Sequence, residues 1–212
     1  MNKRSAPLRL GVLLSGGGTT LENICEYMGR GELDAKVEIV VSTKAKAYGL
    51  VRAKNHGIDA AVVRPKDHAD TESFSEAING CLDQHKVDLV VLAGFLSLWK
   101  IPERYLGRVM NIHPALIPSF CGEGFYGHYV HEAVLKKGAK VSGCTVHFAD
   151  NEYDSGPIIV QKCVSVLEDD TPDSLAARVF EQECKAYPEA IQLFAEGRLK
   201  IDGNRTRILP AK

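Results

Sequence analysis

Short apolar runs alternate with longer amphipathic segments through the first half of the chain, and this alternation constrains the fold more than any other feature. We expect buried strands at 8–14, 36–42, 60–64, 87–94 and 108–112. Helices are expected between them at 20–31, 46–57 and 69–85, with a short helix at 101–107. Strands that alternate with helices predict an α/β fold with a doubly wound, mostly parallel, Rossmann-like sheet.

The second half of the chain has longer apolar segments. Two strands at 141–150 and 156–166, joined by an acidic turn, predict an antiparallel or mixed extension of the sheet. A long C-terminal helix is expected over 171–200, with Thr171 as N-cap and a kink or a break at Pro188. We expect a single domain over 1–212, made of two halves at about 8–110 and 111–200.

Composition narrows the class of protein. The formal net charge of −1 gives no electrostatic signature of nucleic-acid binding, and no apolar run is long enough to span a membrane. The six cysteines include no C-x-x-C pair, which favours reduced thiols over a disulfide framework or a zinc site. We therefore expect a soluble, cytoplasmic protein that uses no metal.

A glycine-rich loop separates the first strand from the first helix. Glycines let backbone N–H groups approach an anion, and the helix N-terminus and the hydroxyls add further donors. The loop lacks the lysine of a P-loop, and Leu21 replaces the last glycine of the dinucleotide fingerprint. A phosphate monoester is the expected ligand, and a tight turn without a ligand is the alternative. The loop residues are Ser15, Gly16, Gly17, Gly18, Thr19 and Thr20.

The stretch "NIHP" closes the fifth expected strand. Asn111 and His113 are two residues apart, so on a strand they point to the same side, at the carboxyl end where open α/β sheets bind ligands. An amide and an imidazolium directed at one point form an oxyanion site. A carboxylate nearby, such as Asp154, would raise the pKa of His113 and accept a proton. An ordinary polar strand end is the alternative.

Other polar residues allow two interpretations each. His147 fits either an active-site position or a hydrogen-bonded core histidine, and Asp154 fits either a catalytic role or turn chemistry in "DSGPI". Glu183 shares one helix face with apolar residues, so it either reaches solvent at the edge or binds a ligand. His128 and His131 in "HYVHE" lack the H-E-x-x-H pattern, and surface histidines on a helix are expected there.

Taken together, these motifs resemble the phosphoribosylglycinamide formyltransferase family. The glycine loop, "LAGF", "NIHPALIPSF", "VHF" and "DSGPII" follow one another in the family's order, and the resemblance runs from about residue 8 to about residue 200. It implies transfer of a formyl group from 10-formyltetrahydrofolate to the amine of glycinamide ribonucleotide, in de novo purine biosynthesis. A monomer or a homodimer is expected.

The resemblance also implies roles for individual residues. The catalytic group would be Asn111, His113 and Asp154, supported by His147. The glycine loop would hold the substrate phosphate and Glu183 the ribose hydroxyls. Residues implied to contact the folate are Leu92, Phe95, Leu96, Ser97, Leu98 and Trp99, together with Ala149 and Asp150 in the turn up to 154.

The sequence departs from common family members at a few positions. Ser97 stands where an arginine often lies beside the pterin, and Gly17 and Thr20 replace asparagines of the phosphate loop. The loop at 121–129 is longer and more aromatic than in many members. These changes leave the catalytic group intact, but they put one pterin contact and some phosphate contacts in doubt.

The sequence leaves three other functions to consider. A formyltransferase acting on initiator tRNA is expected to carry an extra C-terminal RNA-binding domain. A formyltetrahydrofolate hydrolase is expected to have a histidine at position 112, where Ile112 stands. A non-catalytic nucleotide-binding paralogue would keep the glycine loop, but it has no use for an oxyanion site.

Overall fold

The computed structural model describes residues 6–211, which divide into two compact units. The first unit ends at Met110 and the second begins at Asn111. The strand order is β3-β2-β1-β4-β5-β6-β7, with a separate β8-β9 hairpin. The expectation that the whole chain forms one domain stays a prediction.

The first unit is a parallel sheet. Its strands are β1 (Leu8–Leu14), β2 (Ala35–Ser42), β3 (Asp59–Val62) and β4 (Leu89–Leu92). All three strand pairs within it are parallel, with Val12 of β1 opposite Val40 of β2 and Val91 of β4. These three valines are completely buried, as expected for strands that are covered on both faces.

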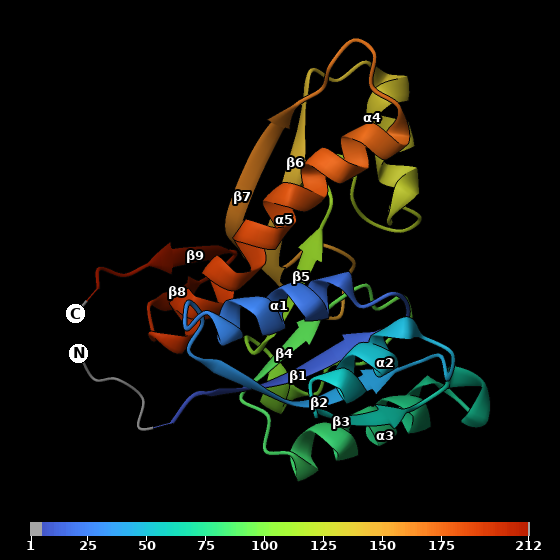
Figure 1. The fold of residues 1–212 in the computed structure, drawn as a ribbon, viewed down its shortest axis with the longest axis vertical. Coiled ribbons are helices and arrows are strands. Elements are labelled where there is room, and N and C mark those ends of the chain that lie inside the picture. Colours follow the sequence, from blue (N-terminus) through green and yellow to red (C-terminus); the bar gives the residue numbers. More distant parts are fainter. Residues whose placement is uncertain (1–5, 212) are drawn as a thin grey trace. The chain divides into compact units, whose positions relative to one another are not determined.

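Helices cover both faces of this sheet (Figure 1). They are α1 (Thr19–Gly29), α2 (Tyr48–Asn55) and α3 (Thr71–Gln84). The chain passes from β1 to β2 to β3 in one direction and then returns to β4 beside β1. Because such crossovers are right-handed, α1 and α2 lie on one face and α3 on the other. The direction of winding therefore reverses between β1 and β4, which is where doubly wound sheets bind ligands.

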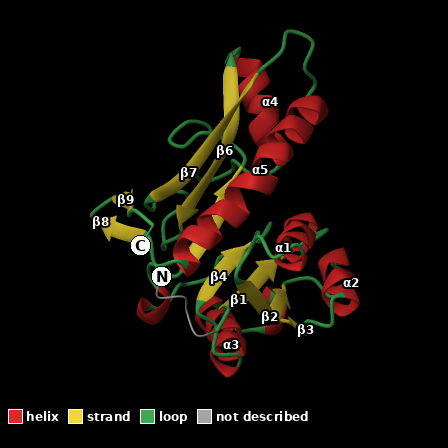
Figure 2. Cartoon of the chain, turned by 60° about the vertical axis from the view of Figure 1, so that its left-hand side comes forward, coloured by secondary structure: helices red, strands yellow, loops and turns green. Residues whose placement is uncertain are grey.

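The second unit combines a strand pair with two helices (Figure 2). Strands β6 (Val141–Phe148) and β7 (Ile158–Ser165) are antiparallel, as the sequence predicted. Helices α4 (His128–Lys137) and α5 (Pro172–Ala195) pack against each other, and α5 also packs on both strands. Strand β5 (Val109–His113) crosses the boundary at Met110 and delivers its last three residues to this unit.

The C-terminal helix is shorter than predicted. The predicted helix reached residue 200, but α5 ends at Ala195 and two strands follow, β8 (Leu199–Asp202) and β9 (Arg205–Ile208). Gly197 explains the end: its φ of 66° is left-handed, and its N–H donates to the Phe194 carbonyl. Pro188 was expected to kink or divide the helix, yet α5 runs across it unbroken.

The shortest elements also differ from expectation. The predicted helix at 101–107 is a single 3₁₀ turn, η2 (Glu103–Tyr105), and a second such turn is η1 (Pro65–Asp67). Among the described residues, no helix has the length and apolar character needed to cross a membrane.

Candidate active site

Strand β5 brings Asn111 and His113 to one carboxylate, as their spacing predicted. The Asn111 amide nitrogen lies 3.5 Å from one Asp154 oxygen. His113 Nδ1 lies 3.6 Å from the other oxygen of Asp154. Because both side chains project from the same side of β5, they converge on a carboxylate that is distant in the sequence.

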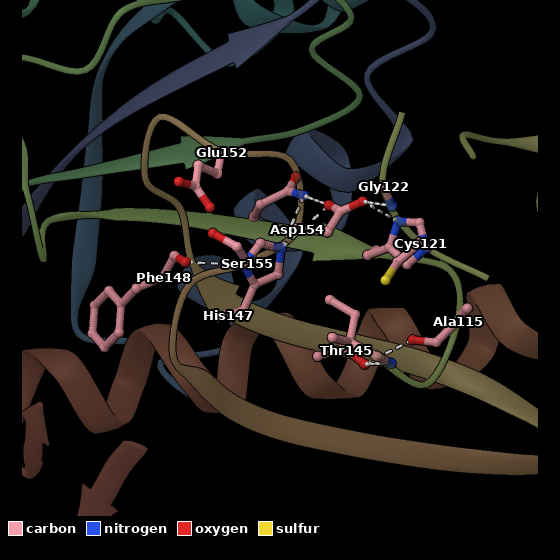
Figure 3. Close-up of polar contacts among 12 residues, drawn as sticks. Ala115, Cys121, Gly122, Thr145, His147, Phe148, Glu152, Asp154 and Ser155 are labelled. Atoms are coloured by element: carbon pink, nitrogen blue, oxygen red, sulfur yellow. Dashed lines mark hydrogen bonds and ion pairs between the residues drawn. The ribbon is translucent and has the colours of Figure 1, made fainter. Parts of the chain in front are cut away.

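Asp154 is held in place by its backbone and by two neighbours. Its φ of 52° is left-handed, which is uncommon for a residue other than glycine. The Gly122 N–H donates to its Oδ2 at 2.9 Å (Figure 3). Burial alone would raise the pKa of Asp154, but hydrogen bonds with His147 and Gly122 outweigh it and leave the pKa below its ordinary value. The carboxylate is therefore ionised in the folded protein.

His113 is buried and contacts an acceptor on each side of its ring. Its Nε2 lies 2.8 Å from the Phe120 carbonyl, which only accepts, so this nitrogen carries a proton. Burial lowers the pKa of His113 more than Asp154 and the Phe120 carbonyl raise it. Asp154 does raise the pKa of His113, as expected. The net shift is nevertheless downward, so the expectation of a raised pKa was wrong, because desolvation of the ring has a larger effect than Asp154.

His147 supports Asn111. Its Nδ1 donates to the Phe148 carbonyl at 2.9 Å, and its Nε2 lies 3.2 Å from the Asn111 amide nitrogen and 3.6 Å from Asp154 Oδ1. Only 1% of His147 is exposed, so the ring is both a buried histidine and a neighbour of the site. The interpretation of His147 as a hydrogen-bonded core histidine is confirmed, and its role in the active site stays a prediction (Figure 3).

Hydrogen bonds between its own residues hold the turn after β6 in shape. The Asp150 carboxylate accepts from the Ser155 hydroxyl at 2.9 and 3.0 Å and from the Glu152 N–H at 2.9 Å. A Cβ at Gly156 would lie 2.0 Å from the Phe148 carbonyl oxygen, so only glycine fits there. These contacts fix the turn that carries Asp154. Ala149, also implied to contact folate, is half-buried beside Asp150.

A cavity of about 500 Å³ opens beside Asp154. The β8-β9 hairpin forms part of its wall. The sequence analysis missed this hairpin, because it extended the helix to residue 200 and assigned no strand after it. Burial raises the pKa of the Cys121 thiol in this cavity, so the thiol is a poor nucleophile. The lining residues are Ile117, Pro118, Cys121, Asp154, Ser155, Gly156, Ile158, Asn204, Arg205 and Thr206.

The glycine loop of the first unit leads directly into α1, and its role as a phosphate site stays a prediction. Gly18 caps α1 with a φ of 72°, and a Cβ there would lie 2.6 Å from the Gly49 Cα. Gly16 and Gly17 are exposed and have open space beside them. Arg52 on α2 donates to the Gly17 carbonyl at 3.0 Å, but it also forms an ion pair with Glu22 on α1 at 2.6 Å, so its charge is compensated within the protein. Sequence reasoning missed Arg52 because nothing in the pattern of α2 distinguishes it from other charged residues.

The segment after β4, implied to contact folate, contains both exposed and buried side chains. Leu96 and Leu98 are exposed, whereas the Trp99 indole is buried. Half-buried residues of the same segment are Leu92, Phe95 and Ser97.

Glu183 lies on the inner face of α5, as its spacing predicted. Leu175, Val179 and Tyr187 on the same face are completely buried. Glu183 itself is half-buried, and burial raises the pKa of its carboxyl to about 7. Such a carboxyl is half-ionised near neutral pH, so its charge responds to whatever binds beside it.

Comparison with known proteins identifies the family. The family model for formyl transferase matches residues 8–191. The phosphoribosylglycinamide formyltransferase of Haemophilus influenzae is 38% identical over 92% of this chain and 91% of its own length. The chain belongs to the phosphoribosylglycinamide formyltransferase family. It is therefore an enzyme of the one-carbon transferase class, as the resemblance implied.

Solved structures of this formyltransferase family agree with the fold. Glycinamide ribonucleotide transformylase 1 from Symbiobacterium toebii is 42% identical, with a TM-score of 0.92 over 99% of this chain and 98% of that one. The phosphoribosylglycinamide formyltransferase of Coxiella burnetii is 33% identical, with a TM-score of 0.86 over 95% and 93% of the two chains. The prediction of an α/β fold with a mostly parallel sheet is confirmed.

One prediction near the formyltransferase site was wrong. His131 was expected on the surface, but only 4% of it is exposed, and its Nδ1 has no hydrogen-bond partner among the described residues. Burial lowers the pKa of His131, and the neighbouring His128 and His113 lower it further. Among residues 6–211, no cluster of three or more His, Cys, Asp or Glu is placed to hold a metal ion.

Acidification is expected to destabilise this formyltransferase through its buried histidines. The pKa values of His113 and His131 are lowered from 6.5 in the folded protein, so the unfolded chain binds protons first as the pH falls. The stability that these two neutral histidines contribute is complete above pH 6.5, and it is lost as the pH falls through their lowered pKa values. The free energy of unfolding, measured with urea between pH 5 and 8, should depend less steeply on pH in His131→Leu than in the wild type. The difference in slope should be up to about 1.4 kcal/mol per pH unit.

The half-exposed His128 is the matched control, because it lies one helical turn before His131. Because His128 is a smaller cause of the lowered pKa of His131 than burial, His128→Leu should change the pH dependence less than His131→Leu does. Equal slopes for wild type and His131→Leu would contradict the prediction.

Proposed function

We propose that this enzyme transfers the formyl group of 10-formyltetrahydrofolate to the amine of glycinamide ribonucleotide, a step of de novo purine biosynthesis. The observation that carries the proposal is the convergence of Asn111, His113 and the ionised Asp154. Family membership supports the choice of donor and acceptor. The folate is a cosubstrate, and the residues named below require no metal.

The reaction begins with attack by the neutral amine on the formyl carbon. A carbon–nitrogen bond forms, the carbonyl oxygen becomes negative, and the attacking nitrogen becomes positive. The proton then moves from that nitrogen to N10 of the folate, the bond from carbon to N10 breaks, and the carbonyl reforms. The protein must therefore stabilise one oxyanion and move one proton.

Asn111 and His113 are placed to stabilise the oxyanion. The Asn111 amide presents N–H donors, and His147 orients it through the 3.2 Å contact. The His113 ring has a lowered pKa because it is buried. A negative oxygen beside the ring would offset that desolvation. We propose that His113 takes up one proton from water as the substrates bind and returns it to water after the carbonyl reforms, which leaves the amine proton to Asp154.

Asp154 would transfer the proton from the attacking amine to N10 of the folate. It lies 3.6 Å from His113 Nδ1, where its charge favours the imidazolium. We propose that it also accepts the amine proton, directly or through a water, and passes it towards N10. The Gly122 N–H and the Asp150-centred turn keep the carboxylate in position.

Binding is assigned to segments of both units. The glycine loop would hold the ribonucleotide phosphate at the N-terminus of α1 through Gly16 to Thr20. Ser15, which was also expected to bind it, has its N–H and hydroxyl engaged with Gly94 and Thr43. Glu183 would accept hydrogen bonds from the ribose hydroxyls. The segment from Leu92 to Trp99 and the turn at Ala149 and Asp150 would contact the folate.

A formyl-transfer assay with and without glycinamide ribonucleotide tests the proposal. Formylation of the ribonucleotide, with stoichiometric loss of 10-formyltetrahydrofolate, is expected. Release of free formate without the ribonucleotide would instead indicate a formyltetrahydrofolate hydrolase. Binding of the ribonucleotide without turnover would indicate a non-catalytic paralogue.

The variant Glu183→Gln should weaken ribonucleotide binding and stabilise the protein. Hydrogen bonds to a charged group contribute about 1.5–3 kcal/mol, so the KM for the ribonucleotide should rise about 10- to 100-fold. Because the folded-state pKa of about 7 exceeds the ordinary 4.5, ionisation opposes folding as the pH rises from 4.5 to 7. Glutamine should therefore raise the free energy of unfolding at pH 8, but not at pH 4.

Both effects are measurable on one preparation, by steady-state kinetics and by urea unfolding. A stability gain at pH 8 without any change in the KM for the ribonucleotide would remove Glu183 from the proposed binding site. The folate KM is the internal control and should stay within about twofold of wild type.

A further inference from the structure

The segment 93–100 combines fixed ends with an exposed apolar middle. Leu96 and Leu98 are 60% and 54% exposed, while Trp99 beside them is only 5% exposed. Both leucine side chains are therefore accessible to a ligand. The segment follows β4 at the point where the winding of the sheet reverses, so these leucines lie where a ligand is expected.

The first end of the segment is tied to the end of β1. The Ser15 N–H donates to the Gly94 carbonyl at 3.0 Å, and the Leu96 N–H donates to the Ser15 hydroxyl oxygen at 3.2 Å. The same hydroxyl lies 2.7 Å from that of Thr43, at the end of β2. Ser15 is 3% exposed, so its hydroxyl serves this junction and not the open part of the glycine loop.

The second end is tied to α3 by two buried polar side chains. The Trp99 indole N–H donates to the Asn79 side-chain oxygen at 3.0 Å, and the Lys100 N–H donates to the Ser75 hydroxyl at 2.9 Å. Ser75 and Asn79 are each 1% exposed and lie one helical turn apart. Buried polar groups on an inner helix face are unfavourable unless they are paired, so their pairing with 99–100 explains their presence.

Each of these two anchors is itself fixed. The Ser75 hydroxyl donates to the Thr71 carbonyl at 2.7 Å, and the Asn79 amide donates to Glu76 at 3.1 Å. Their side chains therefore have one preferred orientation before the segment meets them. The segment 93–100 rests on a preorganised support and not on a flexible contact.

We propose that Asn79, together with Ser75, is a positioning residue for the folate cosubstrate. Asn79 would touch no substrate and would act by holding Trp99, so that Leu96 and Leu98 keep the orientation that contacts the flat pterin ring. This inference rests on the proposed function, because it takes the ligand of the segment to be the folate.

Loss of the anchor has a specific kinetic consequence. When only a fraction of molecules holds the segment correctly, the apparent affinity for the folate falls by that fraction. The catalytic group and Glu183 lie outside the segment, so kcat and the KM for the ribonucleotide should not change. An unpaired buried indole N–H is unfavourable enough to raise the folate KM about 5- to 20-fold.

A double-mutant cycle on Asn79 and Trp99 tests the proposal in the full-length enzyme. Asn79→Leu leaves the indole N–H unpaired, Trp99→Phe leaves the amide oxygen unpaired, and the double variant removes both groups. Each single change should raise the KM for 10-formyltetrahydrofolate about 5- to 20-fold. The double variant should raise it by clearly less than the product of the single effects, because neither group is then left without a partner.

Two further variants make the test robust. Ser75→Ala removes the anchor of Lys100 and keeps a good helix former, so it should also raise the folate KM if Asn79→Leu fails to fold. Asp83→Asn is the matched control, because Asp83 lies on the same helix but accepts from Tyr105 and Arg104, outside the segment. Its folate KM should stay within about twofold of wild type.

The outcomes separate this inference from the proposed function. A wild-type enzyme that does not transfer formyl groups from 10-formyltetrahydrofolate would overturn the proposed function. Normal wild-type transfer with an unchanged folate KM in both folded Asn79→Leu and Ser75→Ala would overturn only the positioning role. Parallel changes in both KM values and kcat would also overturn it, since they would indicate general damage to the fold.

Discussion

Replacing Asp154 with asparagine should lower kcat by about 10²- to 10⁴-fold, the range for loss of a positioned proton acceptor. Asparagine has nearly the same shape and still accepts from the Gly122 N–H that contacts Asp154 at 2.9 Å. What it lacks is the negative charge that lies 3.6 Å from His113 Nδ1 and the ability to take the amine proton. Steady-state formyl transfer at saturating substrates measures the effect.

Asp170 provides the matched control for this change. It is a carboxylate of the same unit, but it pairs with Arg178 at 2.8 Å and caps the start of α5 through Ser174. Asp170→Asn should reduce the free energy of unfolding and leave kcat near wild type. If Asp154→Asn retains wild-type turnover, Asp154 has no part in proton transfer and the mechanism proposed above is wrong.

Replacing Asn111 with alanine should lower kcat by about 10²- to 10³-fold, the usual effect of removing one oxyanion donor. Both substrates should still bind with nearly unchanged KM values, because the donor acts on charge that exists only in the transition state. The change also leaves His147 Nε2 without the amide that lies 3.2 Å away. A small loss of stability, about 1 kcal/mol, should therefore accompany the loss of activity.

Gln161 is the matched control for Asn111. It also places an amide in the second unit, but it donates to the Ile117 carbonyl and the Thr145 hydroxyl, away from Asp154. Gln161→Ala should keep kcat within about twofold of wild type. A fall in kcat of similar size for both variants would show that loss of packing, and not loss of an oxyanion donor, explains Asn111→Ala.

Local patterns were sufficient for most elements of the fold. The alternation of apolar runs and amphipathic segments predicted β1 to β4 and their helices, because period and capping are encoded in neighbouring residues. The C-terminal hairpin was missed, because Gly197 ends α5 within a segment of helical composition. A division of the helix at Pro188 does not occur, since α5 packs on β6 and β7 and remains continuous despite the lost hydrogen bond, whereas a kink there stays a prediction.

For the candidate site, too, the sequence predicted some features and missed others. Spacing alone placed Asn111 and His113 on one side of a strand, and family motifs pointed to Asp154 and His147. The burial of these side chains could not be predicted from residue type and spacing. His131 was assigned to the surface although it is buried, and the net pKa shift of His113 was expected in the wrong direction.

The sequence by itself determined the class of fold, the glycine loop and the identity of the groups that carry the chemistry, because these depend on residue type and short-range spacing. Only the tertiary structure decided which polar groups are desolvated and which partners they meet. Desolvation and hydrogen bonding depend on residues distant in the chain, as Asn79 and Trp99 or Gly122 and Asp154 illustrate. The electrostatics of the site and the support of its binding segment therefore became visible only in three dimensions.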